Sequence, residues 1–324
     1  MQREFDRGYD RQPYRSLVAE YPDESVYPID SFRVEWGPVF HRGRLDGTAR
    51  VLVLGQDPAA HEAIARRILV GEAGQRVQGL LTRLGIDRSY VFVNTYLYSV
   101  FGQRRGERHI DDPAITAYRN RWIDAIVKDQ QIEAIITLGH LADTAYQQWR
   151  TTARGGRNSA AYATVLHPTY PDSASRSKKM TKAEAFALLC TSWNAALGVI
   201  HPAITPDTPL PLRPYGTTIT KDDLTPIPRR DLPPGLPDWM FALETWAMRT
   251  GDTKQLQRAT IAVKVPTRTK GCFRIESVEN GRTRKRGYLL LISSTMRACS
   301  SCVAFDCAPV TPSINGSITT STLD

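Results

Sequence analysis

The chain is poor in cysteine and lacks a long apolar segment. Its five cysteines do not make the disulfide framework of a secreted protein in a chain of 324 residues. Cys299, Cys302 and Cys307 cluster without a fourth ligand nearby, so we expect unligated thiols and predict no metal and no organic cofactor. No stretch approaches the ~20 apolar residues of a membrane span, and the N-terminus is charged. These absences favour a cytoplasmic protein without a membrane partner.

The composition fits a globular protein with an excess of basic residues. A hydrophobic content of 41% is enough for a sizeable core in one large or two ordinary domains. The 42 Lys and Arg residues outnumber the 33 Asp and Glu residues, which gives a net charge of +9. Polyanions such as nucleic acids fit as partners, because basic side chains release counterions from phosphate.

Four short apolar segments alternate with stretches of helical periodicity. The segments typical of buried strands are Val51 to Leu54, Tyr90 to Asn94, Ala134 to Leu138 and Tyr162 to Leu166. Apolar residues recur at helical spacing between them, and a last helix is expected from about Thr181 to Leu197. This alternation predicts an α/β fold, a three-layer sandwich with a central four-stranded parallel sheet flanked by helices.

The strands and helices place one compact domain at residues 46–200. Residues 1–45 are expected to form an N-terminal extension that packs on it. Residues 266–324 have no coherent periodicity and form an irregular basic tail, with a composition that also permits disorder. Within this tail, Arg282 to Arg286 is either a solvated charge run or a phosphate contact.

A proline-rich segment follows the domain. Proline recurs every few residues from Pro202 to Pro237, which disfavours helices and predicts an extended segment on the domain surface. The next residues, Pro237 to Met248, have the pattern of one amphipathic helix. Residues 201–265 are therefore predicted to pack on the surface of the domain.

The segment Val51 to Pro58 joins the first apolar run to a turn that carries one carboxylate. Chemistry in open α/β sheets gathers at the carboxyl ends of parallel strands, which makes Asp57 a candidate catalytic acid. An aspartate before the alanine-rich segment that follows is also a common helix N-cap. Both interpretations of Asp57 stay open on this motif alone.

Four motifs at successive strand ends resemble those of the uracil-DNA glycosylase superfamily, over residues from about 50 to 200. They are Gly55-Gln56-Asp57-Pro58-Ala59, Asn94, Thr137-Leu138-Gly139 and His167-Pro168-Thr169. The first resembles the opening of the GQDPYH motif of the prototype branch, and the last stands where HPS is usual. Arg67 to Gly74 also resembles the R-P-F-V-G-x-x-G segment of the thermophile-type branch. The order of the motifs makes their combination more specific than any one of them.

The resemblance implies a role for each motif in releasing uracil from DNA. Asp57 stabilises the sugar and positions water, and His167 donates to the departing uracil O2, where the backbone of Gln56 also contributes. The amide of Asn94 offers an acceptor and a donor that match N3–H and O4 of a flipped uracil and mismatch cytosine. From the residues alone, Asn94 also fits a strand-ending turn, and His167 fits a buried histidine satisfied by its neighbours.

Two positions of the predicted base-binding pocket depart from the family pattern. The tyrosine that crowds out the thymine methyl is replaced by Ala59 and Ala60. The base-stacking phenylalanine is replaced by Leu69, which removes an aromatic platform worth about 0.5 to 1.5 kcal/mol. We therefore expect imperfect rejection of thymine unless another group supplies it, and slower catalysis unless Phe101 or Tyr96 compensates.

A basic stretch with a histidine follows the second predicted strand and is expected to form a loop. It contains Arg104, Arg105, Arg108 and His109, and it resembles the arginine-rich loop of the branch that traps its product covalently through a histidine. Three uses stay open: a covalent bond from His109 to the sugar, a tight noncovalent grip on the abasic product, and simple phosphate contact.

The motif that begins at His167 continues into a second predicted loop, residues 167–172, which is expected to enter the duplex. Tyr170 is the candidate wedge between bases, although it fits a packing residue equally well. Thr169 takes the place of the usual serine, and Lys178 is expected near the phosphates.

These motifs predict a monofunctional uracil-DNA glycosylase, a monomer that hydrolyses the N-glycosidic bond of uracil and leaves an abasic site for base excision repair. Its predicted partners are uracil-containing DNA and abasic-site DNA. One alternative is a DNA-binding protein for uracil or abasic sites with slow or single-turnover excision, including covalent trapping through His109. Another is an α/β ligand-binding protein that shares only short motifs.

Overall fold

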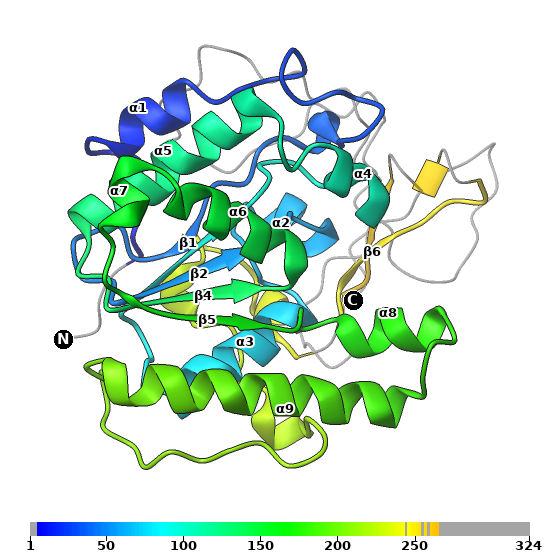
Figure 1. The fold of residues 1–324 in the computed structure, drawn as a ribbon. Helices are drawn as coiled ribbons and strands as arrows, with labels where there is room; N and C mark the ends of the chain where they lie inside the picture. Colours follow the sequence, from blue (N-terminus) through cyan, green and yellow to red (C-terminus); the bar gives the residue numbers. More distant parts are fainter. Residues whose placement is uncertain (1–4, 244, 254–255, 258–259, 266–324) are drawn as a thin grey trace, which may run out of the picture.

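The computed structural model describes residues 5–243, 245–253, 256–257 and 260–265, and its main body is a sheet between two layers of helices (Figure 1). The strands are β1 Arg42–Gly43, β2 Val51–Gly55, β3 Tyr90–Asn94, β4 Ala134–Leu138, β5 Ala161–Val165, β6 Ala247–Arg249 and β7 Ile261–Val263. The α-helices are α1 Tyr14–Ala19, α2 Ala60–Ala65, α3 Glu72–Arg83, α4 Gln103–Arg108, α5 Pro113–Asp129, α6 His140–Arg150, α7 Ala153–Gly156, α8 Tyr170–Arg176 and α9 Lys182–Ile200. The 3-10 helices are η1 Val34–Trp36, η2 His201–Ala203, η3 Lys221–Asp223, η4 Arg229–Asp231 and η5 Asp238–Phe241.

The central sheet has five strands in the order β1-β3-β2-β4-β5. The strands β3, β2, β4 and β5 run parallel, which confirms the predicted parallel sheet. The fifth strand, β1, pairs antiparallel with β3 at the edge, with Arg42 opposite Phe92 and Gly43 opposite Val91. It is not predicted from the sequence, because two residues are too few to show the alternation of a strand.

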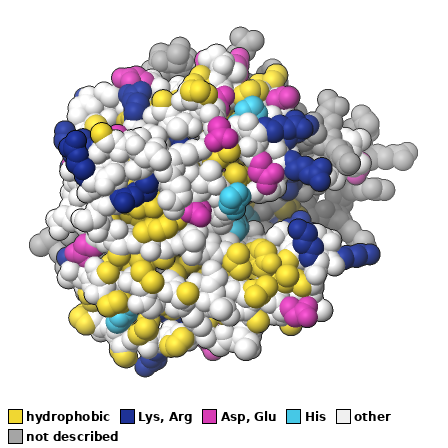
Figure 2. Space-filling view, in the orientation of Figure 1, with side chains coloured by type: hydrophobic (Ala, Val, Ile, Leu, Met, Phe, Trp, Pro, Cys, Tyr) yellow, Lys and Arg dark blue, Asp and Glu magenta, His cyan; other side chains and the backbone are white. Residues whose placement is uncertain are grey.

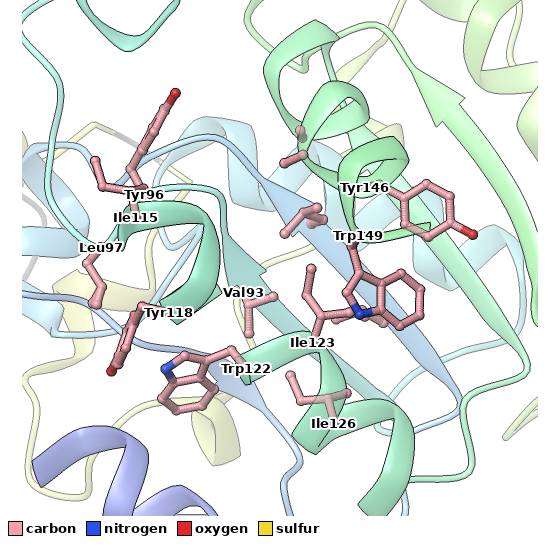
Figure 3. Packing of buried hydrophobic residues seen from close by; sticks show 14 of the residues in the cluster. Val93, Tyr96, Leu97, Ile115, Tyr118, Trp122, Ile123, Ile126, Tyr146 and Trp149 are labelled. Carbon is pink, nitrogen blue, oxygen red and sulfur yellow. The ribbon is translucent and has the colours of Figure 1, made fainter. Parts of the chain in front are cut away.

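Alternate side chains of the buried strands pack against the two layers of helices. Leu52, Leu54 and Val93 pack in one apolar cluster with α1, α5 and α6, and Figure 3 shows the aromatic and aliphatic side chains of α5 and α6 gathered beside Val93. Val53 and Phe92 pack in a second cluster, with α3 and α9. The result is the predicted three-layer sandwich, and it leaves the carboxyl ends of the parallel strands at one edge for loops.

The helix α9 begins close to its predicted start and covers one face of the sheet. Thr181 caps it: the Glu184 backbone N–H donates to Thr181 Oγ1 at 3.2 Å, and the Thr181 N–H donates to Glu184 Oε2 at 2.8 Å. By length and composition, Lys182–Ala203 is apolar enough to cross a membrane, so the expectation that no stretch approaches this length was wrong. In the described structure this helix packs one side on the sheet through Leu189 and Trp193, and its other side is exposed.

The proline-rich segment is tied into the core rather than only lying on the surface. Its described residues 201–243 form 3-10 turns and irregular chain. Asp231 is buried, and its carboxylate Oδ2 lies 2.7 Å from Arg42 Nη1 and accepts a hydrogen bond of 2.6 Å from the Tyr90 hydroxyl. Because Arg42 and Tyr90 belong to β1 and β3, this contact fixes the segment to the sheet.

The amphipathic helix predicted for Pro237 to Met248 was wrong. The chain forms η5 and then β6, which pairs antiparallel with β7. The backbone N–H groups of Trp246 and Ala247 donate to His61 Nε2 at 3.3 and 3.2 Å, and the imidazole meets the Trp246 ring edge to face at 4.7 Å between centroids. These bonds hold the backbone extended, so tertiary pairing outweighs the helical pattern of the sequence.

The β6–β7 hairpin packs against the helix that follows β2. Ala60, Ala65 and Val70 form an apolar cluster with Trp246 and Val263, together with other residues of the C-terminal segment. The division of the chain at residues 45, 200 and 265 stays a prediction. The expectations for the tail, including Arg282 to Arg286 and the three clustered cysteines, concern residues outside the described part of the chain.

Candidate active site

The strands β2 and β3 end side by side at Gly55 and Asn94, which are register partners. A Cβ on Gly55 would lie 2.4 Å from Asn94 Oδ1 and 3.9 Å from Leu69 Cδ1. The Asn94 carbonyl oxygen therefore lies directly above the glycine, and only glycine leaves it that space. Asn94 Nδ2 is buried and has no hydrogen-bond partner among the described residues. The site thus contains a fixed amide with a buried donor that a ligand can satisfy.

Asp57 follows β2 by two residues and is held by two hydrogen bonds. Its Oδ2 accepts from the Val100 backbone N–H at 2.9 Å, and its Oδ1 accepts from Gln56 Nε2 at 2.9 Å. The side chain keeps partial access to water. Burial raises its pKa to about 6, against the lowering effect of both hydrogen bonds and of the Arg33 charge. Asp57 is therefore mostly a carboxylate at neutral pH.

The N-cap interpretation of Asp57 does not fit the structure. Helix α2 starts at Ala60, and the backbone N–H of Ala59 donates to Glu62 Oε2 at 3.0 Å. Glu62, which is 6% exposed, thus supplies the acceptor at this helix terminus. The Asp57 carboxylate is turned instead to Val100, which belongs to the segment after β3.

Glu62 also fixes the position of Leu69. Its Oε1 accepts from the backbone N–H groups of Val70 at 2.9 Å and Gly71 at 3.4 Å. Leu69 has a φ of 54°, in the left-handed region, and it is 9% exposed. The Leu69 side chain is thereby held beside the Asn94 amide, although it offers no aromatic face.

The two candidate replacements for the missing stacking ring, Tyr96 and Phe101, both have other contacts, and their role against a base stays a prediction. The Tyr96 ring is buried, packs against Phe32 at 5.4 Å between centroids, and donates its hydroxyl to the Gly106 carbonyl at 2.6 Å. The Phe101 ring lies 4.4 Å from the Arg33 guanidinium carbon. Both aromatic rings are engaged in packing behind the Asp57 loop.

His167 lies two residues after β5, at the other side of the same edge. A Cβ on Gly139, which follows β4 with a φ of 85°, would lie 3.1 Å from the His167 Cβ. His167 Nδ1 accepts from the Thr169 backbone N–H at 3.2 Å and lies 2.9 Å from Thr169 Oγ1. Burial, with a contribution from the Arg76 charge, lowers the pKa of His167 to about 4. The imidazole is therefore neutral at pH 7 and, with Nδ1 as acceptor, carries its proton on Nε2.

The loop predicted after His167 is partly helical. Tyr170 begins α8, and its hydroxyl lies 3.7 Å from the sulfur of Met180. The predicted wedge is thus a half-buried residue in the first turn of a helix, because Pro171 at the helix start has a favourable φ. Lys178, just after α8, is exposed and has a φ of 55°.

The predicted basic loop is also helical. It forms α4, with Arg104 and Arg108 exposed and Arg105 half-buried. His109 follows the helix, and its ring packs 5.2 Å from that of Phe32. Figure 2 shows Lys and Arg side chains over α4 and α8, with histidine side chains between them, on the side toward which the parallel strands point in Figure 1.

The structure brings the two halves of the predicted site to one edge. Gln56, Asp57, Asn94 and Leu69 gather at the ends of β2 and β3, whereas His167 follows β5. The ends of β2 and β5 are separated by β4, so they lie two strand spacings apart, about 10 Å. Ala59 is exposed at the start of α2 and adds no bulk.

The residues that support this site are not apparent from the sequence. Arg33 and Val100 hold the Asp57 loop, and Arg76 holds the His167 loop through the Pro168 carbonyl. Their partners are far away in the sequence, so no local pattern reveals them. Glu62 is the exception, because an acidic residue three positions after a helix start is a recognisable capping signal.

A comparison with protein families gives the identity of this domain. Residues 42–193 match the model of the uracil DNA glycosylase superfamily. No curated protein matches the chain. The matched residues contain all five strands of the central sheet, with Asp57, Asn94 and His167 at its carboxyl edge. Residues 42–193 therefore form a domain of the uracil-DNA glycosylase superfamily.

Proposed function

We propose that the chain hydrolyses the N-glycosidic bond of flipped-out uracil in DNA and leaves an abasic site, the first step of base excision repair. The main support for this proposal is the position of the Asn94 amide, with Oδ1 above Gly55 and Nδ2 buried without a partner among the described residues. Uracil presents N3–H and O4 side by side, which match an amide acceptor and donor. Cytosine presents the reversed pattern, so it would leave buried groups unpaired.

Asp57 and His167 stabilise opposite charges in this reaction. Bond cleavage leaves positive charge on the sugar and negative charge on the departing base. The Asp57 carboxylate stabilises the sugar cation and orients the attacking water. The neutral imidazole of His167 donates from Nε2 to uracil O2. With pKa values of about 6 for Asp57 and about 4 for His167, both groups have the required form above pH 6.

We further propose that DNA lies across the edge between α4 and α8. The exposed Arg104 and Arg108 are available to phosphates on one side, and Lys178 on the other. The same arginines would hold the abasic product after uracil leaves. Because Leu69 offers no ring for stacking and Ala59 no bulk against a methyl group, slow turnover with strong product retention is the second candidate function.

The test is excision from duplexes with uracil opposite guanine or adenine and from single strands, followed by alkaline cleavage. Excess enzyme measures the chemical step, and excess substrate measures turnover. Excision by wild type but not by Asp57→Asn or His167→Ala supports the proposal. No cleavage with excess enzyme would refute it. A single burst without turnover favours the second candidate function, a protein that keeps its abasic product. A product band that survives hot denaturing electrophoresis identifies covalent trapping, for which His109→Ala is the control.

A further inference from the structure

Arg33 lies in the segment before the family domain, yet it contacts the chain that holds Asp57. It is 3% exposed, and its guanidinium carbon lies 4.8 Å from the Trp36 ring centroid and 4.4 Å from that of Phe101. Its Nη1 donates to Ser99 Oγ at 3.0 Å and to the Val100 carbonyl at 2.5 Å. The charge is thus buried between two rings and directed at the segment after β3.

The backbone around Arg33 supports the same segment. Phe32 and Val100 form an antiparallel bridge. The Arg33 N–H donates to the Ser99 carbonyl at 2.8 Å, and the Phe101 N–H donates to the Ser31 carbonyl at 2.9 Å. Val100, which donates its own N–H to Asp57 Oδ2 at 2.9 Å, is therefore fixed on both sides by residues 31–33.

We infer that Arg33 is a positioning residue of the active site, which holds the Val100 N–H against the Asp57 carboxylate. The inference rests on the proposed role of Asp57 in hydrolysis. It makes the N-terminal segment a part of the catalytic machinery, although that segment lies outside the matched residues 42–193.

The electrostatics of the site agree with this role. Burial raises the pKa of Asp57, and the Val100 hydrogen bond, the Gln56 hydrogen bond and the Arg33 charge lower it, in that order; Glu62 raises it again. Loss of Arg33 removes a cation and loosens the Val100 donor, and both changes raise the pKa of Asp57. The carboxylate would then be protonated over a wider range of acid pH.

Two substitutions separate the charge from the hydrogen bonds. Methionine fills the space between the two rings without a charge. Lysine keeps a positive charge but lacks the planar fork of donors that reaches both Ser99 and Val100. Arg119→Met is the matched control, because Arg119 is also 3% exposed and donates to Gln148 Oε1 at 2.8 Å. The charges that act most on the pKa of Asp57 are those of Arg33 and Glu62.

The experiment combines a carboxyl carbon NMR titration of Asp57 with single-turnover excision of uracil as a function of pH. For Arg33→Met we expect both midpoints to move to higher pH, with a smaller move for Arg33→Lys. At pH 8, where Asp57 is ionised, we expect the Met variant to lose about tenfold to a hundredfold in rate, because the carboxylate is misplaced. Arg119→Met should keep the wild-type midpoints and rate.

A folded Arg33→Met protein whose Asp57 titrates at the wild-type midpoint would overturn the inference, even if its rate falls. If that variant does not fold, the same result with Arg33→Lys overturns it. The NMR titration needs no substrate, so a wild-type protein that excises nothing but shows the expected shift would refute the proposed function and leave the role of Arg33 standing.

Discussion

Arg76 Nη1 donates a hydrogen bond to the carbonyl oxygen of Pro168, the residue next to His167. Arg76 belongs to α3 and is 4% exposed; it also pairs with Glu72 and lies 3.5 Å from Asp172 Oδ2. The loop that carries His167 is therefore fixed to a helix of the layer below the sheet, and a buried positive charge lies near the imidazole.

Arg76→Met should raise the pKa of His167, because it removes a charge that lowers it, although burial still keeps the pKa below its usual value. The excision rate at pH 7 should fall by about tenfold or more as the loop loses its anchor. Imidazole NMR titration and single-turnover kinetics measure the two effects. Arg76→Lys keeps the charge and should titrate closer to wild type; an unchanged His167 midpoint in the Met variant would contradict the prediction.

The pH dependence of excision should follow Asp57. Its carboxyl has a pKa of about 6, so the single-turnover rate should fall about tenfold per pH unit well below pH 6, while His167, with a pKa of about 4, is still neutral. A rate that stays constant from pH 7.5 to pH 5 would show that ionised Asp57 is not required.

Asp57→Asn should lose excision and gain stability at neutral pH. The folded pKa of about 6 lies above the ordinary value of 3.8, so wild type loses stability as pH rises between these values, and the neutral amide does not. The gain is up to about 3 kcal/mol above pH 6 and vanishes near pH 4. Thermal unfolding at both pH values measures it, and an equal melting temperature for both proteins at pH 7.5 would disprove the effect.

Asn94→Ala should abolish selective uracil excision with little effect on stability. The amide nitrogen has no partner among the described residues, so its removal breaks no hydrogen bond of that atom. Kinetics on uracil and cytosine duplexes and a melting curve provide the test. Gly55→Ala is the companion variant, because its methyl group would displace Asn94 Oδ1 and should reduce excision similarly. Wild-type excision rates in both variants would show that Asn94 does not bind the base.

Asp231→Ala should destabilise the fold without touching the site. It leaves Arg42, which is fully buried, without its ion pair, and such a loss costs about 3 to 5 kcal/mol. Denaturant unfolding measures the change. Asp238→Ala, which breaks an exposed pair with Arg229, is the control and should cost less than about 1 kcal/mol. A similar loss of unfolding free energy in both variants would mean that the proline-rich segment is not anchored through Asp231.

The sequence allowed prediction of the four parallel strands and of the residues at their ends, because both depend on short apolar runs and on the turn after each run. It did not allow prediction of α4 and α8, since the glycine in α4 and the proline in α8 favour loops and both helices are short. The supporting contacts are long-range: Asp57 and Val100 are 43 residues apart, and Arg33 and Val100 are 67 apart. No periodicity encodes such pairs, and the helix expected around Trp246 failed for the same reason.

The hydrogen bonds of Trp246 and Ala247 to His61 attach the last described strands to α2, the helix that follows the Asp57 turn. A stop codon after residue 200 would keep every motif of the superfamily and still expose the apolar side of α2 to solvent. We therefore expect a stable folding unit to need residues beyond the family match, which ends at residue 193.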